Sequence, residues 1–306
     1  MDSLPTGFGI AAKYPNDVGI GNDAAVLLHE DFSDFEHGPG KTWAAHGING
    51  DGKPLKLTLP MSSQEVSMGF WQWLDGYEEL FLRYYQKFDK DYDINGSNHC
   101  GPNLSARYYM RPHGQASPGF RANGYNKILV SNEFWRDNDE GDPPGLWNFY
   151  VYHPTQGGRY GDHWYPTGER SVSEGPQSQM NLSPDFIPRP NFRPKRGEWY
   201  CYEFRVKLNS VPEEGIYEFT NENVFGGDRG SVKVLKEPRY LNDGRITSWV
   251  NGQVMADYNN LVLRYTNDLK LDRVEFGLHA KNSPKENSIW YNDIVLAREY
   301  VGPVIK

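Results

Sequence analysis

Two tyrosines that could transfer protons, Tyr150 and Tyr152, stand two positions apart in the stretch NFYVYHP. Residues two apart in a β-strand point to the same face of the sheet. Phe149 and Val151 alternate with them and are expected to face the core, which sends both phenols into a cleft. There they could act as a general acid and base or stack on a sugar ring, and ordinary aromatic packing is the alternative.

A second run, ARYYMRP, offers positive charge. Its alternation places Arg107, Tyr109 and Arg111 on one face of a strand. A buried guanidinium without a partner is costly, so this face is either solvated or an anion site. We expect these three residues to bind an anionic substrate, with Trp164 as a further contact; a surface strand with Arg–Glu pairs is the alternative.

Lys127 and His99 complete the candidate catalytic set. Lys127 alternates with Leu129 and Ser131 and could face the same cleft, although a lysine at a strand start is commonly solvated. His99 lies in the polar stretch GSNHCGP. It could neutralise a substrate carboxylate or act as a base, and a hydrogen-bonded loop histidine is the other reading.

The composition favours an all-β fold and excludes some partners. The 306 residues include 20 Tyr, 9 Trp, 32 Gly and 21 Pro, which suits aromatic strands joined by many turns. A net charge of −8 argues against nucleic acid as a partner. The mean hydropathy of −0.73 and the absence of a long apolar run argue against a membrane span. Cys100 and Cys201 could be bonded or remain two buried thiols.

Short runs with a period of two predict a series of strands and almost no helix. Residues 1–24 are expected to form an extended leader, and residues 25–306 a single domain with an insertion at 210–242. Glu65–Asp75 is the best helix candidate, and Asn251-Gly252 predicts a hairpin turn. The expected strands begin at Ala25, Leu55, Leu80, Ser105, Asn126, Leu146, Trp199, Gly244, Arg273 and Ser288.

The stretches GEWYCYEFRVKLNS, DGRITSWVNGQVMADY and SIWYNDIVLAREYVGP carry a family resemblance. Together they resemble the C-terminal half of jelly-roll polysaccharide lyases of the alginate and glucuronan lyase type, family 14 and more loosely family 20. The resemblance covers residues 26–36 and 80–304. It implies a concanavalin-like β-jelly-roll sandwich of two antiparallel sheets with long loops.

The resemblance also implies an activity, the cleavage of a uronic-acid-containing polysaccharide by β-elimination. Family members carry a lysine before a strand and a Y-x-Y strand, which here match Lys127 and the pair Tyr150 and Tyr152. The S-x-R strand that family members carry between them is not evident. The reaction needs a neutralised carboxylate, a base for the C5 proton and an acid for the leaving oxygen.

Jelly-roll glycan proteins often hold a structural Ca²⁺ between an early acidic residue and an aspartate of the last strand. Here the resemblance implies Glu30 or Asp31 together with Asp293, and no organic cofactor. Residues 91–96 also have the spacing of an EF-hand start. A complete EF-hand is excluded because Pro102 stands where the bidentate glutamate belongs.

Two other classes of function stay open at this point. A non-catalytic glycan-binding jelly roll needs aromatic rings but no acid or base, and a glycoside hydrolase needs two carboxylates beside the bond. We find no E-x-D-x-E strand of the kind that concanavalin-like hydrolases use. The expected partner is a polysaccharide or oligosaccharide, and the protein is expected to be a monomer, secreted or periplasmic, whose leader is not visible in the sequence.

Overall fold

The computed structural model describes residues 4–50, 52–108, 118–136, 141–172, 183–219 and 232–306. The three short 3₁₀ helices are η1 (Ile10–Lys13), η2 (Pro15–Asp17) and η3 (Ile20–Asn22). The strands are β1 (Val26–Glu30), β2 (Ala44–His46), β3 (Leu55–Leu59), β4 (Val66–Tyr77), β5 (Glu79–Phe88), β6 (Gly96–Asn98), β7 (Asn103–Ala106), β8 (Ile128–Arg136), β9 (Leu146–Tyr152), β10 (Asp162–Trp164), β11 (Arg170–Val172), β12 (Trp199–Lys207), β13 (Ile216–Phe219), β14 (Val232–Lys236), β15 (Gly244–Val250), β16 (Gln253–Leu261), β17 (Leu271–Ala280) and β18 (Asn287–Ala297).

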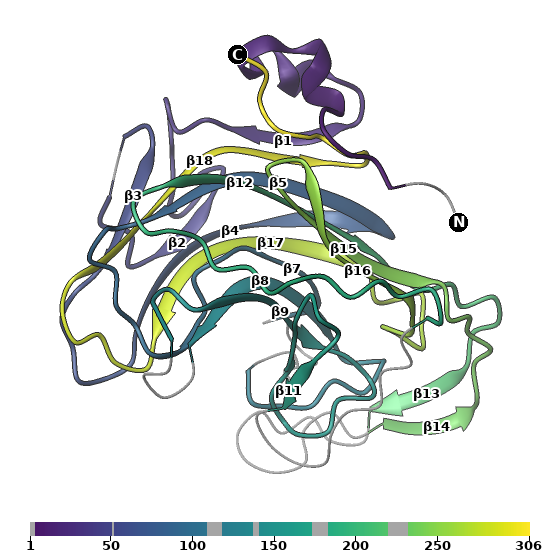
Figure 1. The fold of residues 1–306 in the computed structure, drawn as a ribbon. Helices are drawn as coiled ribbons and strands as arrows, with labels where there is room; N and C mark the ends of the chain where they lie inside the picture. The colour runs from purple at the N-terminus through teal and green to yellow at the C-terminus, as the bar shows by residue number, and fades with distance from the viewer. Residues whose placement is uncertain (1–3, 51, 109–117, 137–140, 173–182, 220–231) are drawn as a thin grey trace.

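Two large antiparallel sheets are stacked face to face (Figure 1). The nine-stranded sheet has the order β11-β10-β9-β8-β7-β17-β4-β2, with β6 beside β8. The seven-stranded sheet has the order β1-β18-β5-β12-β15-β16, with β3 beside β18. The expected jelly-roll sandwich is confirmed.

The core lies between the sheets and is rich in aromatic rings. Tyr84 and Tyr291 of the seven-stranded sheet pack against Phe276 of the nine-stranded sheet, with ring centroids 5.7 and 5.2 Å apart. All three side chains are fully buried. Edge-to-face contacts of this kind fix the spacing of the two sheets as well as burying area.

The helix expected at Glu65–Asp75 is wrong, because residues 66–75 belong to strand β4, which begins directly after Glu65. Met68 and Phe70 point into the core, and β4 pairs with β17 from Val66 to Tyr77. Pairing along a whole long strand outweighs a weak local preference. The turn at Asn251-Gly252 is as predicted, with φ of 49° and 76°. Both cysteines are free and buried.

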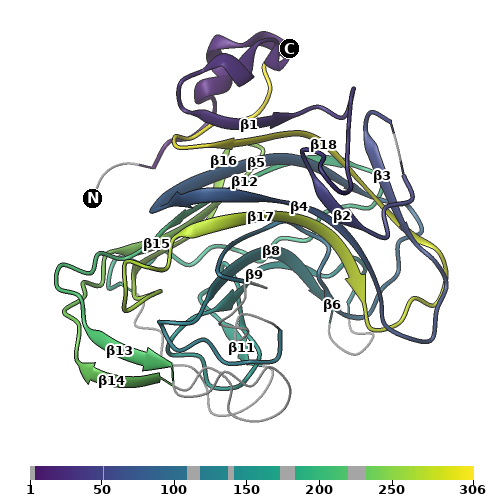
Figure 2. The ribbon, with the colours of Figure 1, turned by 180° about the vertical axis from the view of Figure 1, so that it is seen from behind.

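Residues 4–24 form short turns instead of an extended leader, and they cover part of the outer face of the seven-stranded sheet. Ile10 and Ile20 pack against Val295 in a small separate apolar cluster. Figures 1 and 2 show these turns beside the C-terminal tail, on the side of the sandwich away from the nine-stranded sheet.

The range 210–242, expected to be an insertion, contains the hairpin β13–β14, which pairs only with itself among the described strands. In both views the hairpin lies at the opposite end of the sandwich from β3 (Figures 1 and 2). In the described part of the chain, no helix has the length and apolar character that a bilayer crossing requires.

Candidate active site

A cleft of about 540 Å³ is lined largely by residues of the nine-stranded sheet. It lies on the face of that sheet that is concave in Figure 1. Strands β4, β7, β8, β9, β10 and β17 form its floor and walls, together with the segments before β7 and β8. Its lining combines histidines, tyrosines and carboxylates, among them His99, Tyr108, Tyr150, Tyr152, His163 and Glu275. This is the face on which the sequence placed the candidate catalytic residues.

The alternation predicted for strand β9 is present. Phe149 and Val151 are fully buried in the core, whereas Tyr150 and Tyr152 line the cleft. Both phenols are still largely buried, with relative exposures of 8% and 0%. They therefore form part of a floor that is mostly shielded from water.

The two phenols are hydrogen-bonded to each other. The Tyr150 hydroxyl donates to the Tyr152 hydroxyl over 3.3 Å. Backbone N–H groups donate to each oxygen: Gly161 to Tyr150 over 3.1 Å and Gly119 to Tyr152 over 3.2 Å. Burial raises the pKa of both tyrosines, most strongly that of Tyr150. Both phenols therefore hold their protons at rest, and they can serve as hydrogen-bond donors or acids.

A buried carboxylate, Glu133 on β8, lies beside two histidines of the cleft. Its Oε2 is 2.5 Å from Nδ1 of His99, and its Oε1 is 3.4 Å from Nδ1 of His163. Glu133 is completely buried, whereas 36% of the His99 side chain is exposed. Burial raises the pKa of Glu133, and the neighbouring His99 offsets part of that rise. His99 thus has one side on the buried carboxyl group of Glu133 and the other open to the cleft.

The two histidines differ in their protonation. Burial lowers the pKa of His99, but the Glu133 carboxylate outweighs it, and the pKa lies above its usual value. Burial and the positive charge of His99 lower the pKa of His163 to about 3. His99 therefore holds a proton more readily than a free histidine, whereas His163 is a neutral imidazole whose Nδ1 lies 2.8 Å from Oδ1 of Asn148.

Lys127 lies behind the tyrosines. Its side chain is fully buried, and its Nζ is 4.0 Å from the ring centroid of Tyr152 and 5.2 Å from that of Tyr108. Burial lowers the pKa of the amine well below its usual value. Burial therefore favours the uncharged amine, which can accept a proton, so this group is a candidate base behind the phenols.

The rim of the cleft contains further charged groups. His279 Nε2 lies 2.9 Å from Oε1 of Glu65. Glu275 accepts hydrogen bonds from Asn103 Nδ2 over 3.0 Å and from Arg273 Nη1 over 2.5 Å. The rim can therefore offer both donors and acceptors to a polar ligand.

Arg107 differs from its prediction. Strand β7 ends at Ala106, and Arg107 takes a left-handed conformation with φ of 53°. Its guanidinium donates to the Tyr125 carbonyl over 3.2 Å and lies 3.8 Å from Asp268, and the side chain does not line the cleft. The alternation breaks there, and Tyr108 lines the cleft instead. Tyr109 and Arg111 lie outside the described residues.

Trp164 is also placed differently from the prediction of a substrate contact. Its side chain is buried in the core and packs on His153 and Tyr258, with ring centroids 5.1 and 5.5 Å apart. The preceding residue, His163, faces the cleft. A shift of one position along a strand moves a side chain to the other face.

The residues expected to hold calcium are already engaged with other groups. The two carboxylate oxygens of Glu30 accept from the Phe32 N–H and from Trp43 Nε1. Asp31 forms an ion pair with Lys53 over 2.7 Å. Asp293 accepts from the neighbouring Asn292 amide.

Among the residues that the structure describes, no three His, Cys, Asp or Glu side chains are grouped to hold a metal ion. Protein donors contact both carboxylate oxygens of Glu30 and of Asp31 and one oxygen of Asp293, and the calcium site stays a prediction. We derive no step of the chemistry from calcium.

The sequence reading missed Glu133, His163 and Tyr108. A signal existed for Glu133, which follows Ser131 by two positions and so shares its face of β8. His163 lies on a three-residue strand inside a stretch interpreted as loop, and no pattern of that length identifies a strand.

No protein-family model matches the chain, and no curated protein matches it in sequence. Solved structures do match its fold. A double mutant of alginate lyase Aly36B in complex with alginate trisaccharide has a TM-score of 0.54 at 15% identity, covering 91% of this chain and 100% of that one.

Two further structures agree with this match. Alginate lyase Aly36B itself gives a TM-score of 0.50 at 15% identity, covering 99% of this chain and 95% of that one. Alginate lyase vAL-1 from Chlorella virus gives a TM-score of 0.51 at 12% identity, covering 85% of this chain and 90% of that one. The chain is therefore similar in fold to jelly-roll polysaccharide lyases, the resemblance that its C-terminal strands indicated.

Proposed function

We propose that the protein is a polysaccharide lyase that cleaves a uronic-acid-containing polysaccharide by β-elimination. The observation that carries the proposal is the hydrogen-bonded pair Tyr150 and Tyr152 in the concave cleft. Beside it lies His99, an imidazolium held on the buried Glu133. An acid, an acceptor for a proton and a positive charge are the groups that the reaction requires.

In this proposal His99 neutralises the substrate carboxylate. A carboxylate at C5 disfavours removal of the C5 proton because a second negative charge would develop beside it. An imidazolium hydrogen-bonded to that carboxylate stabilises the developing charge, and the protected side of the cleft strengthens the interaction. The bond to Glu133 keeps His99 protonated and fixes its ring.

The proton transfers follow from the tyrosine pair and the lysine behind it. Tyr152 takes the C5 proton while its own phenolic proton passes to the neutral amine of Lys127. The C5–H electrons form the C4=C5 double bond, and the C4–O bond breaks with its electrons on the leaving oxygen. Tyr150 protonates that oxygen and regains its proton from Lys127 through Tyr152.

The substrate class also suggests where the protein acts. A polysaccharide is too large to diffuse into a cell intact, so we propose that the protein meets it outside the cytoplasm, after secretion or in a periplasm.

The experiment is incubation with glucuronan and with alginate while ultraviolet absorbance is followed, because the new C4=C5 double bond conjugates with the carboxylate. We expect absorbance to rise with one or both polymers. Tyr150→Phe and Tyr152→Phe should each reduce kcat/KM by about 10²–10⁴-fold, the usual value of one acid or base.

Tyr200→Phe is the matched control. It removes a phenolic hydroxyl that donates to Glu198 outside the cleft, and we expect unchanged activity. New reducing ends without absorbance would indicate a hydrolase, and binding without either product a glycan-binding protein. Full activity in both Tyr150→Phe and Tyr152→Phe would overturn the assignment of the pair.

A further inference from the structure

Lysines and tryptophans alternate in a row across four strands on the outer face of the seven-stranded sheet. The row is Lys56 on β3, Trp290 on β18, Lys87 on β5 and Trp199 on β12. The registers pair each with the next: Lys56 with Trp290, Trp290 with Lys87, and Lys87 with Trp199. Their strand neighbours point into the core, so all four side chains point outward.

The members of this lysine–tryptophan row are in contact. The Nζ of Lys56 is 5.2 Å from the ring centroid of Trp290, and the Nζ of Lys87 is 4.4 Å from that ring and 5.0 Å from the Trp199 ring. These are cation–π distances, and they hold the flexible lysines in a fixed order. Four adjacent strands span about 14 Å at ~4.8 Å per strand, the length of a short oligosaccharide.

The row stays accessible while the neighbouring part of the same face is covered. Residues 4–22 and the C-terminal tail pack over the middle of the sheet, where the Pro5 carbonyl accepts from Trp249 and the Val304 N–H donates to Tyr85. Trp199 keeps 38% of its surface exposed, and Lys56 is exposed.

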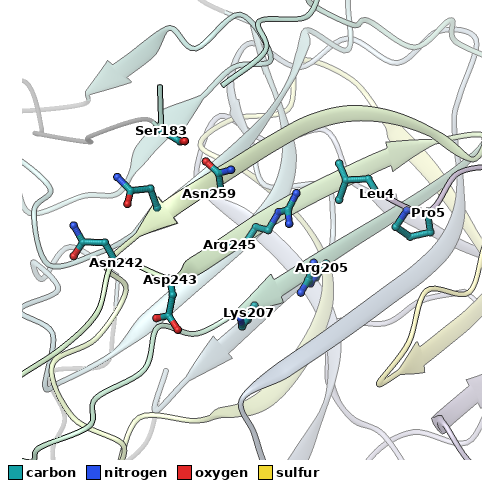
Figure 3. A pocket seen from close by; sticks show the side chains of 10 residues that line it. Leu4, Pro5, Ser183, Arg205, Lys207, Asn242, Asp243, Arg245 and Asn259 are labelled. Atoms are coloured by element: carbon teal, nitrogen blue, oxygen red, sulfur yellow. The ribbon is translucent and has the colours of Figure 1, made fainter. Parts of the chain in front are cut away.

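The two lysines of the row have no carboxylate within ion-pair distance among the described residues. Another part of this sheet provides a contrast, where Figure 3 shows Arg205 of β12 and Arg245 of β15 on neighbouring strands. There Arg205 pairs with Glu79 over 2.6 Å, and Arg245 pairs with Asp257 over 2.7 Å. In a protein with a net charge of −8, the lysines of the row offer positive charge that no described acid neutralises.

We propose that the lysine–tryptophan row is a second polysaccharide-binding surface, which holds a segment of an anionic polysaccharide outside the catalytic cleft. The indole rings offer apolar surface to sugar rings, and the ammonium groups pair with carboxylates along the polymer. The choice of a uronate polymer rests on the proposed function.

The row and the cleft lie on opposite sides of the sandwich, so one polymer molecule could occupy both only by bending around an edge. In a suspension or gel of polymer, the row would instead hold the enzyme near other chains. Such tethering raises the effective concentration of substrate at the cleft without any change in the cleft itself.

The test is electrophoresis of the full chain through gels that contain glucuronan, a neutral cellulose derivative or polyglutamate. The background substitution Tyr150→Phe is present in all samples, so that cleavage of the polymer in the gel is slowed. We expect glucuronan to retard this protein most. Lys56→Gln/Lys87→Gln and, separately, Trp199→Ala/Trp290→Ala should each weaken that binding about tenfold, ~1.4 kcal/mol.

Lys236→Gln/Lys270→Gln is the matched control, because it removes the same charge from exposed lysines outside the row, and it should bind as the parent does. Without the background substitution, the row variants should cleave tetrasaccharides at the parental rate. Retardation unchanged in both row variants would overturn the proposal, as would equal retardation by polyglutamate or by the neutral polymer. If the protein showed no lyase activity but the row variants still lost glucuronan binding, only the proposed function would be overturned, and the proposal for the row would stand.

Discussion

Charged groups are buried on both sides of the sandwich, but in two different ways. On the outer side Arg83 forms a buried ion pair with Asp17, and Glu203 accepts from the N–H groups of Val301 and Gly302. On the concave side Glu133 lies against His99, which keeps one side open to the cleft.

The difference separates charge that supports the fold from charge that can react. The outer pairs are covered by residues 4–22 and by the C-terminal tail, so both partners are enclosed by protein. In the cleft, burial shifts the pKa of groups that a ligand can still approach, directly or through a phenol. We therefore expect substitutions on the outer side to change stability, and substitutions in the cleft to change activity.

The largest stability effect should come from Asp17→Asn. Asparagine tolerates the positive φ of 57° at this position, so the change removes the charge with little backbone strain. Arg83 is then left buried without its partner, which costs roughly 3–5 kcal/mol. Denaturant unfolding measures the loss, and the remaining folded protein should keep its activity.

Glu36→Gln is the control for this prediction. It removes a carboxylate from an exposed ion pair with Lys41, and exposed pairs contribute little. A loss of activity in folded Asp17→Asn protein, with stability unchanged, would contradict the division between the two sides.

Lys127→Met should raise stability and lower activity, the reverse of the effects expected for Asp17→Asn. Burial lowers the pKa of this amine, so folding disfavours its protonated form relative to the unfolded chain, and an apolar side chain of similar length avoids that cost. We expect a higher free energy of unfolding and a kcat/KM lower by about 10²-fold or more. Lower stability combined with full activity would make Lys127 a purely structural residue.

Glu133→Gln should reduce kcat/KM by about tenfold to 10²-fold while the protein remains folded, because the amide keeps the shape but not the charge that holds His99 protonated. Glu203→Gln is the matched control, a buried carboxylate on the outer side. If Glu203→Gln lost more activity than Glu133→Gln, the comparison between the two sides would fail.

The smallest effect should be a shift in the pH profile. The pKa of His99 is raised above its usual 6.5, so its imidazolium, and the stability it contributes, is fully present below that value and is lost as pH rises through the raised pKa. Activity that needs the imidazolium should fall along the same alkaline limb. In Glu133→Gln this limb should move to lower pH, which kcat/KM measured across pH would show; an unmoved limb would assign it to another group.

The alternation of residues was sufficient to predict most strands and the orientation of Tyr150 and Tyr152, and the family resemblance implied the sandwich. The alternation failed where a single residue changed the local geometry. Arg107 adopts a positive φ at a strand end, which inverts the expected faces, and nothing in the letters ARYYMRP indicates this. Trp164, expected to contact the substrate, lies in the core because it belongs to β10, a strand of only three residues within a stretch interpreted as loop.

Long-range pairing accounts for the other differences. Glu65–Asp75 resembles a weak helix locally, and its partner strand β17 lies about 200 residues later in the chain. Glu133 and His99 are 34 positions apart, and only the folded sheet brings them together. The chemistry of individual residues could be predicted from the sequence, whereas most of their neighbours could not.

The position of β17 in the nine-stranded sheet also has a consequence for synthesis. β17 lies between β7 and β4, and its residues Glu275, Gly277, Leu278 and His279 help to line the cleft. Synthesis must pass residue 280 before this strand can insert, and until then the edges of β4 and β7 that pair with it are unpaired. We expect early folding intermediates to be prone to aggregation and catalytically inert, with the cleft completed among the last events of folding.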